Sequence, residues 1–144
     1  MTRAFTATLF LGAVAALAAP DHFTLSAAYV PPAKAKATGT VAVTFVPADP
    51  DVKVNQEPAP RLKLDPEQFV LVDRQGPPAR RGESGGEPKY LDPSLPVAFP
   101  VSLNPKAPKG EQPVKGTVTY FYCSKREGWC RKGTGDVTFT VAVP

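Results

Sequence analysis

The chain has 144 residues, a formal net charge of +4, 42% hydrophobic residues and 21% charged residues, which fits one domain of ordinary soluble composition. Its 18 prolines disfavour a helical bundle or a doubly wound α/β fold, because an interior proline costs a helix about 3 kcal/mol. One histidine, His22, excludes multi-histidine metal sites. Without a dense Lys/Arg run or a Gly-rich phosphate loop, nucleic-acid and nucleotide binding are not expected.

The first residues have the three-part pattern of a secretory signal peptide. Arg3 supplies the positive start, residues 4–17 form an uncharged and mostly apolar run, and Ala18 ends a small-residue cleavage site. The alternative, a membrane anchor, is less favoured because the run is shorter than the roughly 20 residues of a spanning helix. We expect residues 1–18 to be removed, and residues 19–144 to be one exported domain, periplasmic or secreted, without stable membrane insertion.

The rest of the chain has the periodicity of strands. Short apolar or alternating runs, rich in β-branched and aromatic residues, are separated by Pro, Gly and Asp. They predict about eight strands. The first lies near residues 23–25, and the others are residues 40–45, 51–54, 61–64, 69–72, 97–103, 116–123 and 136–143. The predicted fold is all-β, a β-sandwich of antiparallel sheets.

Four segments allow finer predictions. The uninterrupted apolar run at residues 69–72 predicts a strand buried on both faces. Pro100, inside residues 97–103, predicts an edge strand or a bulge. Residues 73–92 are rich in Gly, Pro and charge and predict a long surface loop, while residues 104–113 predict a Pro/Lys-rich connection.

Both cysteines lie in the exported part, near the end of the chain. A strong strand runs into Cys123, six residues follow, and Cys130 precedes a second strand. Such a hairpin can place the cysteines opposite each other, at a separation that suits a disulfide. An even cysteine count in an oxidising compartment likewise predicts one disulfide.

The surroundings of the cysteine pair leave two roles open. A loop this short gives only about 2–3 kcal/mol in the entropy model, so a structural staple is a modest reason for the bond. Flanking cations favour the thiolate, the species that attacks disulfides; these cations are Lys125, Arg126, Arg131 and Lys132. Nearby aromatic residues would shield the sulfurs or give a partner protein a flat apolar surface. The predicted partner-contact residues are Tyr120, Tyr122, Trp129, Lys125 and Arg126.

Residues 115–130, KGTVTYFYCSKREGWC, resemble the N-terminal periplasmic domain of the thiol:disulfide interchange protein DsbD. Residues 52–66, VKVNQEPAPRLKLDP, are similar to the same family more weakly. The resemblance implies an immunoglobulin-like sandwich with Cys123 and Cys130 as an exposed redox pair. In the family this pair takes electrons from a membrane domain and passes them to periplasmic disulfide proteins, under a flexible cap loop. Residues 73–92 are the cap-loop candidate by position.

Three functions follow as hypotheses. The first is an exported thiol–disulfide exchange module that passes electrons between a partner reductant, a membrane or periplasmic redox protein, and periplasmic disulfide proteins. Catalysis would rest on Cys123 and Cys130, without a cofactor or metal, and the attacking cysteine stays open. The alternative is a secreted immunoglobulin-like binding or structural domain whose disulfide is purely structural. A metal carrier using both cysteines and His22 is the weakest hypothesis.

Overall fold

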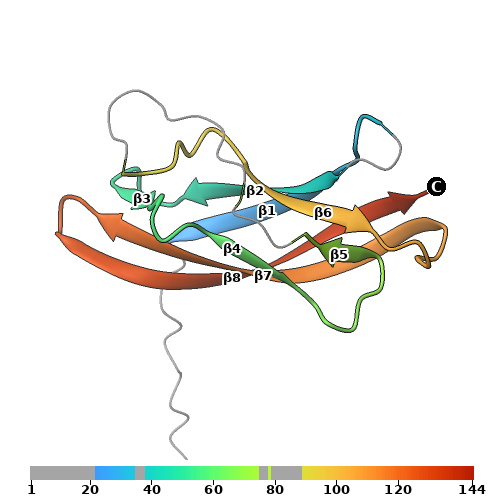
Figure 1. The fold of residues 1–144 in the computed structure, drawn as a ribbon. Coiled ribbons are helices and arrows are strands. Elements are labelled where there is room, and N and C mark those ends of the chain that lie inside the picture. The colour runs from blue at the N-terminus through green and yellow to red at the C-terminus, as the bar shows by residue number, and fades with distance from the viewer. Residues whose placement is uncertain (1–21, 35–37, 75–77, 79–88) are drawn as a thin grey trace, which may run out of the picture.

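The computed structural model describes residues 22–34, 38–74, 78 and 89–144. Eight strands form two four-stranded antiparallel sheets that face each other as a sandwich, and the described residues contain no helix (Figure 1). The strands are β1 (Phe23–Val30), β2 (Gly39–Pro47), β3 (Val52–Val54), β4 (Arg61–Leu64), β5 (Leu71–Asp73), β6 (Val97–Leu103), β7 (Gly110–Ser124) and β8 (Trp129–Val143). The predicted all-β sandwich is confirmed.

The first sheet has the order β1-β2-β6-β5, and in the second β3 and β4 lie along one side of β7 while β8 lies along the other. Alternate residues of these strands point inward and form the core, as the period of two requires. The core is mostly valine with a few aromatic rings: Val41, Val43 and Phe45 on β2, Val97, Phe99 and Val101 on β6, Val114, Val118 and Tyr120 on β7, and Val137, Phe139 and Val141 on β8.

The β7–β8 hairpin is the longest feature of the fold and lies across the length of the sandwich (Figure 1). Its pairing is continuous from Gly110 opposite Val143 to Ser124 opposite Trp129. Both strands are therefore longer than the predicted residues 116–123 and 136–143. The predicted start of the second strand, residue 136, is too late because Gly133 and Gly135 interrupt the apolar alternation in the first half of β8. They do not interrupt its pairing with β7.

The prediction that residues 69–72 form a strand buried on both faces is wrong. Phe69 is 72% exposed, and the strand is β5, in which only Leu71 is buried. The reason is position, because β5 lies at the edge of its sheet and pairs with β6 alone. The Gln68 side chain accepts hydrogen bonds from the N–H groups of Val70 and Leu71 at 2.9 Å and so fixes the entry into this strand.

The prediction of an edge strand or a bulge at Pro100 is also wrong. Strand β6 lies between β2 and β5, and its register with β2 is regular through Pro100 opposite Thr40. The N–H and C=O sides of one strand residue face the same neighbour. Because the Pro100 carbonyl accepts the Arg74 N–H at 3.2 Å, its nitrogen faces the end of β5 and the β2 pairing loses no hydrogen bond.

The predicted connection at residues 104–113 is too long at its end, because β7 already begins at Gly110. Pro113 lies inside β7, opposite Thr140. It is tolerated there because β4 pairs only as far as Gly116, which leaves β8 as the described neighbour of this part of β7.

Two predictions concern residues outside the described part of the chain. The signal peptide at residues 1–18 lies wholly there, and of the predicted loop at residues 73–92 only the ends and Pro78 are described. Within the described part, no helix has the length and apolar character needed to cross a membrane.

Replacing Gly133 with alanine should destabilise the sandwich, because Gly133 lies opposite Tyr120 in the hairpin. A Cβ atom at residue 133 would lie 2.7 Å from the Cζ atom of Tyr120. The Tyr120 ring cannot retreat, since Phe23 and Phe45 pack edge-on against it. We expect Gly133→Ala to lower the free energy of unfolding by about 1–3 kcal/mol, measured by denaturant titration.

The control is Thr134→Ser at the exposed neighbouring residue, for which a change within about 0.5 kcal/mol is expected. Equal losses in the two variants would contradict the close packing of Tyr120 on Gly133.

Candidate functional site

The two cysteines form a disulfide at the tip of the β7–β8 hairpin, as predicted. Cys123 lies directly opposite Cys130 in the register of the two strands. Their Cα atoms are 4.0 Å apart and the S–S distance is 2.06 Å. The antiparallel pairing itself therefore brings the sulfurs together, and the four-residue turn at residues 125–128 only returns the chain.

The disulfide lies on the outer face of its sheet and its two halves differ in exposure. Tyr120 and Tyr122 face the core, so Cys123 between them and the turn points to the opposite face. Cys123 is nevertheless only 3% exposed, whereas Cys130 is an exposed residue. Cys130 is therefore the half of the bond that lies at the solvent-exposed surface.

The buried half of the disulfide touches a buried side-chain amide. The Oδ1 atom of Asn55 lies 3.3 Å from the Sγ atom of Cys123. Asn55, just after β3, is 8% exposed, and its backbone N–H donates to the Phe121 carbonyl at 2.8 Å. Asn55 therefore continues the pairing of β3 with β7 and presents its amide oxygen to the sulfur.

A short segment at residues 89–91 extends the same sheet beyond Asn55. Tyr90 forms a β-bridge with Asn55, and the Leu91 N–H donates to the Val54 carbonyl at 2.9 Å. Residues opposite each other in a bridge share a face, so Tyr90 lies on the outer face with Asn55 and the disulfide. The Lys125 ammonium lies 5.9 Å from the centre of the Tyr90 ring, which links this segment to the hairpin turn.

Hydrogen bonds to Asp51 hold the hairpin turn against the loop between β2 and β3. The Ser124 hydroxyl donates to the Asp51 carboxylate at 2.5 Å, and the Arg126 N–H lies 3.1 Å from both carboxylate oxygens. The Arg126 guanidinium forms a salt bridge with Asp49 at 2.9 Å. Gly128, with φ of 73°, takes the left-handed conformation that closes the turn.

These contacts set the charge state of the turn. The hydrogen bond from Ser124 lowers the pKa of Asp51 below its ordinary value of 3.8, and Arg126 and Lys125 lower it further while partial burial opposes them. The hydrogen bond to Asp49 raises the pKa of Arg126. The turn therefore keeps its charged hydrogen bonds throughout the neutral range.

The predicted partner-contact residues separate into two groups. Tyr120 and Tyr122 are only 6% and 7% exposed and belong to the core. Trp129 is half-buried, while Lys125 and Arg126 are exposed. All three lie at the hairpin tip, but Trp129 is on the inner face of the hairpin, opposite the face that carries the disulfide.

Trp129 belongs to an aromatic cluster on the inner side of the hairpin tip. Its ring lies 5.4 Å from His22 and 5.8 Å from Tyr122 between ring centres. The Arg131 guanidinium lies 4.2 Å from the ring centre, a cation–π contact. The indole N–H donates to the Glu127 carboxylate. Trp129 is therefore held in one orientation, with part of its surface open to solvent.

His22 packs on aromatic rings, at 5.3 Å from Tyr122 between ring centres. Among the residues that the structure describes, no group of three or more His, Cys, Asp or Glu side chains is placed to hold a metal ion. Both cysteines are occupied in the disulfide. The contacts of His22 are thus those of a packing residue.

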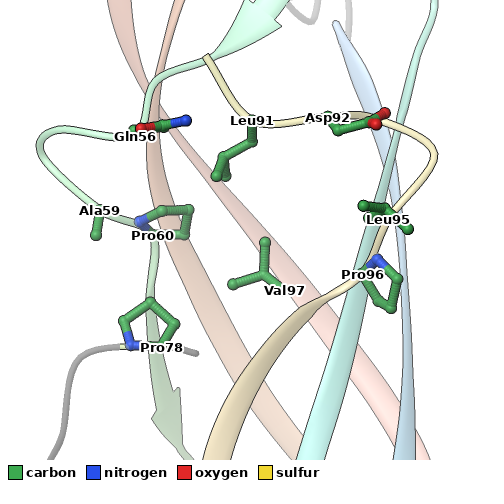
Figure 2. Close-up of a pocket in the computed structure, with 9 residues that line it drawn as sticks. All are labelled: Gln56, Ala59, Pro60, Pro78, Leu91, Asp92, Leu95, Pro96 and Val97. Atoms are coloured by element: carbon green, nitrogen blue, oxygen red, sulfur yellow. The ribbon is translucent and has the colours of Figure 1, made fainter. Parts of the chain in front are cut away.

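A small hollow opens between β4 and the start of β6. Leu91, Val97 and Pro60 point into it, with Gln56 at its upper rim (Figure 2). The Gln56 amide donates to the Tyr90 carbonyl at 3.1 Å and so faces away from the disulfide. Proline and aliphatic side chains dominate the lining, and among its described residues Asp92 is the one ionisable side chain.

Three residues of the site were not predicted from the sequence, namely Asn55, Asp51 and Tyr90. The hairpin pattern points to the cysteines, but the contacting residues are distant along the chain. Asn55 is 68 residues from Cys123, and Asp51 is 73 residues from Ser124. The available signal was weak: VKVNQEP holds a polar Asn-Gln pair directly after an alternating run, where a buried amide would need a defined partner.

Comparison of the chain with protein-family models, with curated proteins and with solved structures gives no match. The fold and the site themselves define the structural class of the protein, which is a two-sheet β-sandwich with one disulfide at a hairpin tip.

The lowered pKa of Asp51 predicts a specific loss of stability in acid. A carboxylate whose pKa is lowered by folding stabilises the folded state at every pH above its ordinary pKa. This contribution disappears as the pH falls through the lowered pKa of the folded state. Asp51→Asn should be less stable than the wild type near pH 6, and the two proteins should converge as the pH falls below 3.8. Denaturant titrations between neutral and acidic pH measure the difference.

The control is Glu111→Gln, an exposed carboxylate near the far end of β7. A gap between wild type and Asp51→Asn that stays constant with pH would show that the charge of Asp51 does not hold the turn.

Proposed function

We propose that the protein is an exported thiol–disulfide exchange module whose reactive pair is Cys123 and Cys130. The observation that carries the proposal is the asymmetry of the disulfide, in which an exposed Cys130 is joined to a buried Cys123. Exchange needs one sulfur that a partner can reach and a second sulfur that is kept from side reactions until it is used. The pair on the outer sheet face meets both requirements.

A purely structural role explains the position of the bond less well. The disulfide joins two residues that the β7–β8 pairing already holds opposite each other, along fifteen consecutive residue pairs. Asp51 holds the turn independently. A disulfide stabilises mainly by restricting the unfolded chain, and a loop of this length gains little. Its removal should therefore leave the sandwich folded.

The proposed reaction starts from the reduced pair. The Cys130 thiolate attacks one sulfur of a partner disulfide, which forms a mixed disulfide and releases one partner thiolate. The Cys123 thiol then loses its proton and attacks the Cys130 sulfur, which releases the second partner thiolate. Two electrons pass to the partner, which ends as a dithiol, and the module ends as the Cys123–Cys130 disulfide. A dithiol protein, the partner reductant, restores the reduced pair by the reverse steps.

The hairpin tip suits a protein partner. Lys132 shares the outer face with the disulfide and Lys125 lies in the turn. Trp129, with Arg131 on its ring, offers a partly exposed aromatic surface on the opposite face of the same tip. Aromatic and arginine side chains are those that most often carry binding energy in protein interfaces. The partners that we propose are membrane or periplasmic redox proteins, in line with the expected signal peptide.

The resemblance to the N-terminal domain of DsbD supports the same proposal. The residues that carry it, 115–130, form the hairpin with the disulfide, and an immunoglobulin-like sandwich is the fold that the family implies. The cap-loop candidate at residues 73–92 contributes Tyr90, at its described end, to the outer face beside Asn55. The described end of this candidate, residues 89–91, is held by hydrogen bonds to Val54 and Gln56 on either side of Asn55.

Single-cysteine variants test the proposal and the order of attack. With oxidised glutathione as the probe, Cys123→Ser, which keeps Cys130, should form a glutathione adduct about tenfold or more faster than Cys130→Ser, which keeps only the buried cysteine. Mass spectrometry over time measures both rates. The wild-type pair should equilibrate with glutathione at a reduction potential above about −300 mV.

The double variant Cys123→Ser/Cys130→Ser is the control for folding and should keep the circular dichroism spectrum of the wild type. A potential far below about −300 mV, with equally slow adduct formation in both single variants, would reject exchange. That result would favour the alternative, a secreted binding domain with a structural disulfide.

A further inference from the structure

We propose that Asn55 is the residue that controls Cys123: in the reduced protein the Cys123 thiol donates its hydrogen to Asn55 Oδ1, which stabilises the dithiol state and leaves Cys130 to act as the nucleophile. That the effect of Asn55 on Cys123 matters for electron transfer to a partner rests on the proposed function. The contact itself is a property of the cysteine pair and can be measured without any partner.

The geometry places an acceptor where the thiol hydrogen would be. In the disulfide, Sγ of Cys123 has no hydrogen, yet Asn55 Oδ1 already lies 3.3 Å from it, a normal distance for an S–H···O hydrogen bond. Both residues are buried, so water does not compete freely with the amide oxygen. The backbone N–H of Asn55 and the bridge to Tyr90 fix the position of the amide.

Reduction changes what this contact contributes. Two electrons and two protons convert the disulfide into two thiols, and one of the new S–H groups then has Asn55 Oδ1 as its acceptor. A hydrogen bond made only in the reduced state shifts the equilibrium toward that state. A carbonyl oxygen also opposes loss of the proton, since hydrogen bonding to the neutral form disfavours the charged form.

The surrounding charges act in the other direction. On the same outer face lie Lys53 opposite Cys123 on β3 and Lys132 on β8, and Lys89 and Lys125 lie over the Tyr90 ring. These cations favour thiolates at both sulfurs. The Asn55 amide oxygen contacts Cys123, so it separates the behaviour of the two cysteines. Cys130, exposed and next to Lys132 on the same strand, ionises first.

The order of ionisation has a consequence for the exchange reaction. Once Cys130 is bound in a mixed disulfide, Cys123 must give up its proton before it can attack. An acceptor that holds the proton on Cys123 slows this second step. Asn55 therefore lengthens the lifetime of the mixed disulfide, which gives a correct partner time to complete its own contacts.

The test compares two substitutions at residue 55. Asn55→Leu keeps the volume but removes the acceptor, and the equilibrium constant with glutathione should shift about two- to tenfold toward the disulfide, the usual worth of one hydrogen bond. In the Cys130→Ser background, the rate of iodoacetamide alkylation of Cys123 should reach its midpoint at a lower pH in Asn55→Leu than in the parent. Asn55→Asp keeps an acceptor and adds negative charge, so its midpoint should move to a higher pH.

Gln56→Ala is the matched control, because Gln56 is a buried amide one residue further on that contacts Tyr90 and not the sulfurs. Its equilibrium constant should stay within about twofold of the wild type, below the expected hydrogen-bond effect. Denaturant titration of the oxidised proteins checks that each variant folds.

The inference is overturned if Asn55→Leu leaves the equilibrium constant unchanged, or shifts it toward the dithiol, or if both substitutions move the alkylation midpoint in the same direction. An equal shift in Gln56→Ala would assign the effect to general loosening and would also overturn it. Failure of the exchange role would look different: the reduction potential of the wild type would lie far below about −300 mV, while the ratio of the equilibrium constants of wild type and Asn55→Leu would remain.

Discussion

The structure depends above all on the continuous antiparallel pairing of β7 with β8. This pairing carries core residues such as Val114 and Val141 on one face and sets Cys123 opposite Cys130 at its end. Because side chains alternate strictly between faces, the register that buries the valines also forces the cysteines to the outer face. A slip of one residue would expose the core and separate the sulfurs, so packing of the core and placement of the disulfide are one constraint.

The same constraint explains why the outer face can hold a buried sulfur at all. One sheet face exposed to solvent would normally leave Cys123 open. Here β3 and the segment at residues 89–91 widen the sheet beyond β7 and bring Asn55 and Tyr90 alongside. Cys130 lies on β8, which is the edge strand of its sheet, because β7 is the one strand paired with it among the described residues. The difference in exposure between the two cysteines thus follows from the sheet order.

The sequence was sufficient where the signal was local. Strand periodicity predicted the all-β sandwich, and the cysteine spacing within a hairpin predicted the disulfide. It was insufficient where position in the sheet decides: Phe69 and its neighbours read as a buried strand, but β5 is an edge, and Pro100 read as an edge residue although β6 is internal. Asn55 and Asp51 could not be assigned because their partners, Cys123 and Ser124, are distant in sequence and only the fold of β3 onto β7 joins them.

A bond that contributes little to the fold is one that can be broken without losing the fold. The β7–β8 pairing and the contacts of Asp51 hold the hairpin tip in addition to the disulfide, which is why we propose that the tip stays folded on reduction. Reduction then changes only local chemistry, and the free energy of that change is set by the few groups that touch the sulfurs. In the proposed exchange site, the buried amide of Asn55 at 3.3 Å from the Cys123 sulfur is the group through which we infer that the balance between disulfide and dithiol is adjusted.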